Sequence, residues 1–70
     1  MSAVAFTAPY EGLKDIMREQ GVSQSELASH LGIDRATLNL KINRTRGRDF
    51  EFSEALKISE YLNIELQQII

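Results

Sequence analysis

The run from Ser23 to Asn43 constrains the fold most strongly, because it contains two helix signatures separated by one turn glycine. Ser23 is a good N-cap residue, and Glu26 three positions later completes a capping box. Gly32 is suited to end this helix, since a positive φ after the last turn is least costly for glycine. Asp34 can cap a second helix. The run therefore predicts two short helices that meet at a tight turn.

Apolar residues recur in these two helices at positions that share a face. Leu27 and Leu31 lie four residues apart, and Ala28 offers the small surface that a closely crossing helix requires. Leu38 and Ile42 form the buried stripe of the second helix. The two helices are therefore expected to pack on a shared core.

Helical periodicity also predicts one helix before this pair. Thr7 can cap it, Pro9 is tolerated in its first turn, and Gly21 follows its last residue, Gln20. Acidic and basic residues interleave on its outer face, so that face is interpreted as solvated rather than metal-binding. The apolar residues at helical spacing are Tyr10, Leu13, Ile16 and Met17.

Two more helices are expected after the pair. Asn63 is placed to end the fourth helix, and residues 64–70 fit a fifth, whose apolar residues turn inward or toward a partner. Phe50 and Phe52 are expected in the core. The sequence thus predicts an all-α fold, a compact bundle of five short helices. The apolar stripe of the fourth helix comprises Phe52, Ala55, Leu56, Ile58 and Leu62, and that of the fifth Leu66, Ile69 and Ile70.

Seventy residues with 43% hydrophobic content suffice for one small domain. Residues 1–9 are expected to form an N-terminal tail and residues 10–70 the domain. The chain has no cysteine, which suits a reducing compartment and excludes disulfides and thiolate zinc sites. It also lacks an apolar run that could span a bilayer and a signal-peptide pattern. A cytoplasmic protein without a membrane partner is therefore expected.

Enzymatic chemistry has no support in the sequence. His30 is the only histidine, and it stands without a second nitrogen or sulfur ligand for a metal or a nucleophile at a recognisable spacing. It is interpreted as an exposed helix residue. No glycine-rich phosphate loop occurs. No catalytic residue, metal, cofactor or small-molecule ligand is therefore expected.

The charge distribution is more informative than the formal net charge of −2. Residues 35–48 carry five basic side chains and no acidic one, whereas the rest of the chain carries three basic and ten acidic side chains. Such segregation places positive potential on one face and repels DNA elsewhere. A solvated arginine-rich loop is the plainer alternative, but the coincidence with the second helix of the pair favours a nucleic-acid contact.

These residues resemble the Cro/repressor-type helix-turn-helix family of small phage and bacterial regulators, with the motif at about residues 23–43. Gln24 is the first motif position, Ala28 matches the small fifth position and Gly32 the ninth. The resemblance covers roughly residues 13–70 and implies a lambda-repressor-like DNA-binding fold. The apolar motif sites are matched by Leu27, Leu31, Ile33 and Leu38.

Two positions depart from the family pattern. Lys41 stands at a site that is usually apolar late in the third helix, and Ile42 is expected to take over its burial. Arg44 stands where the family usually has a glycine, and the loop that follows is about two residues longer than the common form. Gly47 supplies the flexible point of that loop.

The outer face of the third helix is predicted to enter the major groove of double-stranded DNA. With 100° per residue and Leu38 toward the core, the opposite side carries Ala36 and Leu40, which suit thymine methyl groups. Asn39 can pair with the adenine edge. Family geometry adds Arg35, whose guanidinium suits guanine. The expected base contacts are Arg35, Ala36, Asn39 and Leu40; Asn39 as neutral surface and Leu40 packed on a partner protein are the alternatives.

Other residues are expected to contact the DNA backbone. The resemblance gives Gln24, at the start of the second helix, a phosphate contact, although a simply exposed glutamine is the alternative. Thr37 suits either a base or a phosphate. One loop arginine can also enter the adjacent minor groove. The expected backbone contacts are Gln24, Thr37, Lys41, Asn43, Arg44, Arg46 and Arg48.

The sequence therefore favours a DNA-binding transcriptional regulator, Cro-like or repressor-like, which binds a palindromic operator as a homodimer through its third helix. The alternative is a protein-interaction module on the same fold, such as an antitoxin or an anti-repressor partner. Candidate dimer contacts are the C-terminal residues Leu66, Ile69 and Ile70, followed by the tail around residues 4–6.

Overall fold

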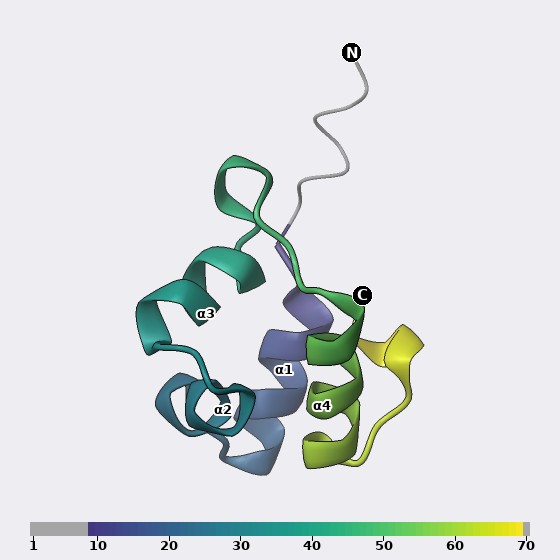
Figure 1. The fold of residues 1–70 in the computed structure, drawn as a ribbon. Coiled ribbons are helices and arrows are strands. Elements are labelled where there is room, and N and C mark those ends of the chain that lie inside the picture. The colour runs from purple at the N-terminus through teal and green to yellow at the C-terminus, as the bar shows by residue number, and fades with distance from the viewer. Residues whose placement is uncertain (1–8, 70) are drawn as a thin grey trace.

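The computed structural model describes residues 9–69, and within that range the chain forms four α-helices and two short 3-10 turns (Figure 1). No strand occurs in this range. The predicted all-helical fold is therefore confirmed. In chain order the elements are α1 (Glu11–Gln20), α2 (Gln24–Leu31), α3 (Arg35–Ile42), the turn η2 (Thr45–Gly47), α4 (Phe52–Leu62) and the turn η3 (Leu66–Gln68).

The prediction of five helices is wrong, because the described residues after α4 form only the turn η3. The Ile69 N–H donates to the Leu66 carbonyl at 3.1 Å, which is the i to i+3 pattern of a 3-10 turn. Residues three apart eclipse in such a turn, so half-buried Leu66 and buried Ile69 both face the core. Ile70, predicted to turn inward or toward a partner, lies outside the described residues.

The predicted ends of α2 and α3 are confirmed by their capping contacts. The Glu26 N–H donates to the Ser23 hydroxyl at 3.0 Å, and the Glu26 carboxylate accepts from the Ser23 N–H at 3.3 Å. Gly32 has a φ of 75° after α2. The Thr37 N–H donates to the Asp34 carboxylate at 2.7 Å, a hydrogen bond that lowers the pKa of Asp34.

The first helix starts later than predicted. Tyr10 is the N-cap of α1, so Pro9 precedes the helix instead of lying in its first turn. The Tyr10 N–H donates to the Ile42 carbonyl at 2.9 Å, which holds this part of the chain against the end of α3. Thr7, the predicted cap, lies outside the described residues, as does most of the predicted tail.

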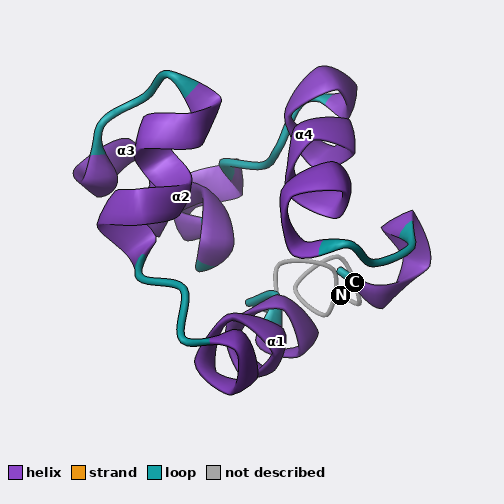
Figure 2. Cartoon of the chain, turned by 90° about the horizontal axis from the view of Figure 1, so that it is seen from below, coloured by secondary structure: helices purple, strands orange, loops and turns teal. Residues whose placement is uncertain are grey.

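The core lies where the four helices meet. α2 packs against both α3 and α4, and α1 contacts α4 (Figure 2). The Gln20 side chain also donates to the Leu62 carbonyl at 2.8 Å and so ties the ends of α1 and α4 together. The buried apolar residues are Leu13, Met17, Leu27, Ala28, Leu31, Leu38, Ile42, Ile58, Leu62 and Ile69.

The predicted apolar stripe of α4 is wrong at two positions. Phe52 is 70% exposed and Leu56 is 38% exposed, whereas Ile58 and Leu62 are buried and Ala55 packs on the core. At 100° per residue, Phe52 is turned by roughly 90° and Leu56 by roughly 130° from the direction of the buried side chains. Phe50, by contrast, is half-buried and packs on the core as expected, with its ring 5.5 Å from that of Tyr10.

Within residues 9–69, no helix is both long and apolar enough to cross a membrane.

Candidate nucleic-acid interface

The exposed face of α3 carries the side chains that were expected to meet bases. Arg35, Ala36 and Asn39 are exposed, and Leu40 is partly exposed. Leu38 and Ile42 on the other side are fully buried, so the orientation predicted for this helix is confirmed. In Figure 1, α3 lies at one flank of the domain and the loop that follows it projects from the helical body. Thr37 is partly exposed.

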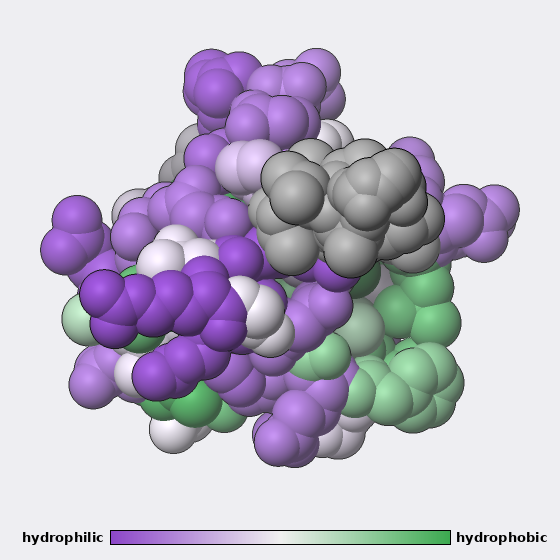
Figure 3. All heavy atoms as spheres, turned by 90° about the horizontal axis from the view of Figure 1, so that it is seen from above, coloured by the Kyte–Doolittle hydropathy of each residue, from purple (hydrophilic) through white to green (hydrophobic). Residues whose placement is uncertain are grey.

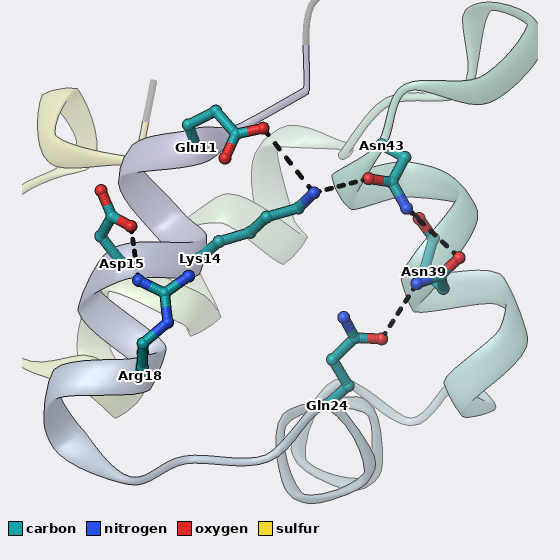
Figure 4. A network of polar contacts seen from close by, with 7 residues as sticks. All are labelled: Glu11, Lys14, Asp15, Arg18, Gln24, Asn39 and Asn43. Carbon is teal, nitrogen blue, oxygen red and sulfur yellow. Dashed lines mark hydrogen bonds and ion pairs between the residues drawn. The ribbon is translucent and has the colours of Figure 1, made fainter.

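A chain of polar contacts joins α3 to the start of α2 and to α1 (Figure 4). The Asn39 amide donates to the Gln24 side-chain oxygen at 3.3 Å. The Asn43 amide donates to the Asn39 carbonyl at 3.0 Å and to its side-chain oxygen at 3.3 Å. Lys14 donates to the Asn43 side-chain oxygen at 2.8 Å. These contacts orient Gln24, Asn39 and Asn43 as one unit at the junction of three helices.

Lys14 is a member of this site that the sequence did not reveal. In the sequence it is one of two cations that alternate with acids on the outer face of the first helix, and its ammonium does lie 3.8 Å from a carboxylate oxygen of Glu11. Its ammonium nevertheless points toward the end of α3, where it donates a hydrogen bond to Asn43, whereas its 3.8 Å distance to Glu11 is too long for one. A hollow of about 260 Å³ lies beside it and is lined by Lys14, Met17, Arg18, Val22 and Gln24.

Lys41 is engaged by an acidic partner on α4. Its ammonium lies 2.7 and 2.9 Å from the two carboxylate oxygens of Glu54, and the two side chains are only 14% and 13% exposed. Burial opposes ionisation of Glu54, but the hydrogen bond and charge of Lys41 and the Glu51 N–H outweigh it and lower the pKa of Glu54. The family pattern predicts an apolar residue at this position. The ion pair with Glu54 compensates the charge of the largely buried Lys41.

The loop after α3 is bent by three residues with positive φ: Arg44 at 54°, Arg46 at 54° and Gly47 at 79°. The predicted flexible point at Gly47 is therefore a left-handed residue. The guanidinium of Arg44 lies 5.0 Å from the Tyr10 ring centroid and 3.3 Å from a carboxylate oxygen of Asp49. Like Lys41, this arginine thus has an internal partner.

Three arginines of the basic segment remain without an ion pair among residues 9–69: Arg35, Arg46 and Arg48. All three are exposed. They lie at the start of α3 and along the projecting loop, so their charge is available to an external anion.

His30 is exposed at the end of α2, as predicted, and its ring packs on that of Tyr61 with 4.5 Å between the centroids. Among the described residues, no group of histidine and acidic side chains is arranged to hold a metal ion.

The geometry so described is that of two capped helices joined by a glycine turn, with the second helix presenting a polar and cationic face. Comparison with protein families found a match to the Cro/C1-type HTH DNA-binding domain over residues 12–70. No curated protein and no solved structure matches the chain. Because the family match spans most of the chain, from the second residue of α1 through α4 and η3, the protein belongs to the Cro/C1-type helix-turn-helix DNA-binding family.

Proposed function

We propose that this protein is a sequence-specific transcriptional regulator that binds a palindromic operator as a homodimer, with α3 in the major groove of each half-site. The observation that carries the proposal is Arg35, an exposed arginine without an ion pair in the described chain, in the first turn of α3. Side chains in this turn face base edges when a recognition helix docks. A guanidinium there can donate two hydrogen bonds to guanine.

The remaining exposed residues of α3 complete a face that can distinguish bases. Ala36 and Leu40 offer apolar contact to thymine methyl groups, and Asn39 offers an amide to adenine. The hydrogen bond between Asn39 and Gln24 fixes the direction of that amide, because the Asn39 nitrogen already donates to the Gln24 oxygen. Base reading by Asn39 therefore depends on Gln24.

Phosphate contacts are assigned to groups around this face. Gln24 and Thr37 lie near the N-terminal ends of α2 and α3, where free N–H groups favour anions. Asn43 and Lys14 join them from the polar chain, and Arg46 and Arg48 from the loop. Lys41 and Arg44 have internal acidic partners, so we assign them to holding α3 and the loop rather than to phosphate.

A homodimer follows from the small size of one recognition surface. One helix reads few base pairs, and two-fold pairing extends the contact to half-sites about one helical turn apart. Ile69 is 4% exposed and packs in the core, so it has little surface for a dimer contact. Leu66 is only partly buried and is therefore the described C-terminal candidate that could contact a second copy. Phe52 lies nearby, because both residues line one groove of about 380 Å³.

The apolar surface at the start of α4 supports that dimer contact. Phe52 and Leu56 are the most exposed large aliphatic or aromatic side chains of α4. Figure 3 shows the larger group of hydrophobic residues at the right of that view, with smaller groups elsewhere. The same exposed residues favour the second candidate function, an interaction module such as an antitoxin or an anti-repressor partner. DNA affinity distinguishes the two functions.

The test compares two substitutions that remove the same charge. Operators are selected from random DNA, and binding of the selected and random duplexes is measured over a range of salt concentrations. Arg35→Ala is expected to weaken operator binding by about 1–3 kcal/mol and random binding much less. The control Lys57→Ala, an exposed cation on α4, should change both affinities equally and slightly. Equal losses on the two duplexes for Arg35→Ala would refute base reading. Absence of salt-dependent binding by the wild type would favour the interaction module.

A further inference from the structure

Arg44 has a backbone conformation that its own side chain disfavours. It directly follows α3 and its C-cap Asn43, and its φ of 54° and ψ of 38° lie in the left-handed region. This region costs steric energy for a residue with a Cβ. Two contacts of the Arg44 side chain can offset that cost, one with the ring of Tyr10 and one with the carboxylate of Asp49.

Tyr10 is bonded to both ends of the loop that carries the arginines. Its N–H donates to the carbonyl of Ile42, the last residue of α3, at 2.9 Å. Its hydroxyl donates to the carboxylate of Asp49, where the loop returns toward α4. That carboxylate also accepts the Phe50 N–H at 2.7 Å, which sets its orientation. Tyr10 thus links the two ends of the loop between Ile42 and Asp49, through its main chain at one end and its hydroxyl at the other.

We propose that Tyr10 and Asp49 are positioning residues that hold the arginine loop in shape for DNA, with Arg44 as the internal anchor and Arg46 and Arg48 as the phosphate contacts. The inference rests on the proposed function. A loop that is already ordered loses less conformational freedom on binding, so the affinity gained from its arginines is larger. Arg46 and Arg48 are exposed and have no ion pair in the described range, so they are the side chains that an ordered loop would offer to phosphate.

The protonation states of the pair keep the contact in place around neutral pH. Burial and the neighbouring Asp49 raise the pKa of Tyr10 to about 12, so its hydroxyl remains a donor. Burial opposes ionisation of Asp49, but the hydrogen bonds from Tyr10 and the Phe50 N–H and the charge of Arg44 outweigh it and lower the pKa of Asp49.

The chain offers a matched pair of substitutions to test the role of the hydroxyl. Tyr10→Phe keeps the ring beside Arg44 and the main-chain bond to Ile42, but removes the donor to Asp49. Tyr61→Phe also removes a tyrosine hydroxyl that donates to a carboxylate, in this case to Glu26 at 2.8 Å. Neither Tyr61 nor Glu26 belongs to the arginine loop. Any general effect of losing a surface hydroxyl is common to both.

Each protein is titrated with a random-sequence duplex, and ¹⁵N relaxation of the Gly47 and Arg48 amides is recorded without DNA. Tyr10→Phe is expected to bind the duplex about three- to tenfold more weakly than Tyr61→Phe and to show faster internal motion at these amides. Equal affinity or equal loop motion in the two variants would overturn the inference. Absence of duplex binding by the wild type would instead defeat the proposed function, and the inference with it.

Asp49→Asn adds a test in which the direction of the change in DNA affinity distinguishes the positioning role from a simple effect of charge. Removing a negative charge close to DNA should strengthen binding through long-range electrostatics alone. The positioning role predicts weaker binding, because the anchor of Arg44 and the acceptor of the Tyr10 hydroxyl are both impaired. Binding equal to or stronger than that of the wild type would contradict it.

Discussion

The ion pair between Lys41 and Glu54 makes a quantitative prediction about stability. The pair joins α3 to the first turn of α4, and both side chains are nearly nine-tenths shielded from water. Breaking a shielded pair leaves one charge without its partner, whereas replacing both charges together removes the desolvation penalty as well. Lys41→Met restores the apolar character usual at this site in the family. Glu54→Gln keeps an oxygen that can accept the Glu51 N–H.

The magnitude follows from the geometry of the pair. Its two hydrogen bonds, at 2.7 and 2.9 Å, involve ionised groups, which contribute about 1.5–3 kcal/mol, and the residual exposure extends this range downward to about 1 kcal/mol. Lys41→Met alone is therefore expected to lower the free energy of unfolding by about 1–3 kcal/mol. For a domain of this size, each kcal/mol corresponds to roughly 4–8 °C in Tm. The double variant should recover most of the loss.

Urea unfolding followed by far-ultraviolet circular dichroism measures all four proteins of this cycle. If the losses of Lys41→Met and Glu54→Gln simply add in the double variant, the pair does not couple and the reasoning is refuted. Lys41→Met should also keep the salt dependence of wild-type DNA binding, because we assign its ammonium to Glu54 rather than to phosphate. A weaker dependence of DNA affinity on salt concentration in Lys41→Met would indicate that Lys41 contacts a phosphate after all.

The pair also sets the sign of a pH dependence. The pKa of Glu54 is lowered in the folded state, so the unfolded chain binds a proton more readily. The contribution of Glu54 to stability is therefore fully present above the unfolded pKa. It is lost as the pH falls below about 4 and through the folded value. In Glu54→Gln this part of the acid dependence should be absent.

Two further substitutions probe the dimer contact and the turn of the motif. Phe52→Ser should leave the melting temperature nearly unchanged, because the side chain is 70% exposed, but should weaken self-association in sedimentation with operator DNA; unchanged association would place the dimer contact elsewhere. Gly32→Ala should cost about 1–2 kcal/mol in urea unfolding through its φ of 75° alone, since an added Cβ meets no atom within 4 Å; a neutral effect would remove backbone conformation as the reason for this glycine.

The sequence predicted both ends of α2, the start of α3 and the end of α4 because the causes of these ends are local. The Ser23 capping box, the Asp34 cap and the left-handed Asn63 each depend on atoms within a few residues. The orientation of α3 was also predictable, since Leu38 and Ile42 define one side of a regular helix. The prediction that Phe52 and Leu56 are buried was wrong because hydrophobicity alone does not say how wide the buried side of α4 is. That width depends on how closely α1 and α2 approach it.

The polar chain from Lys14 to Gln24 could not be predicted, because its members lie on three helices whose packing brings them together. From the sequence, Lys14 had equally good partners among the acids of its own helix. Only the folded chain shows that Lys14 donates to the Asn43 side-chain oxygen at 2.8 Å. Tyr10 is a similar case: its spacing indicates a helix, but its hydroxyl meets Asp49 from 39 residues away.

The same packing revises what the charge segregation means. The sequence places five cations and no acid between residues 35 and 48, which suggests a uniformly attractive surface. In the folded chain, Glu54 and Asp49, both just beyond that segment, neutralise Lys41 and Arg44. The cations of this segment without an ion pair among residues 9–69 are thus separated into Arg35 at the start of α3 and Arg46 and Arg48 on the loop. Under the proposed function, a surface divided in this way would let the loop set affinity and Arg35 set sequence preference, because phosphate contacts are common to all duplexes and a guanine contact is not.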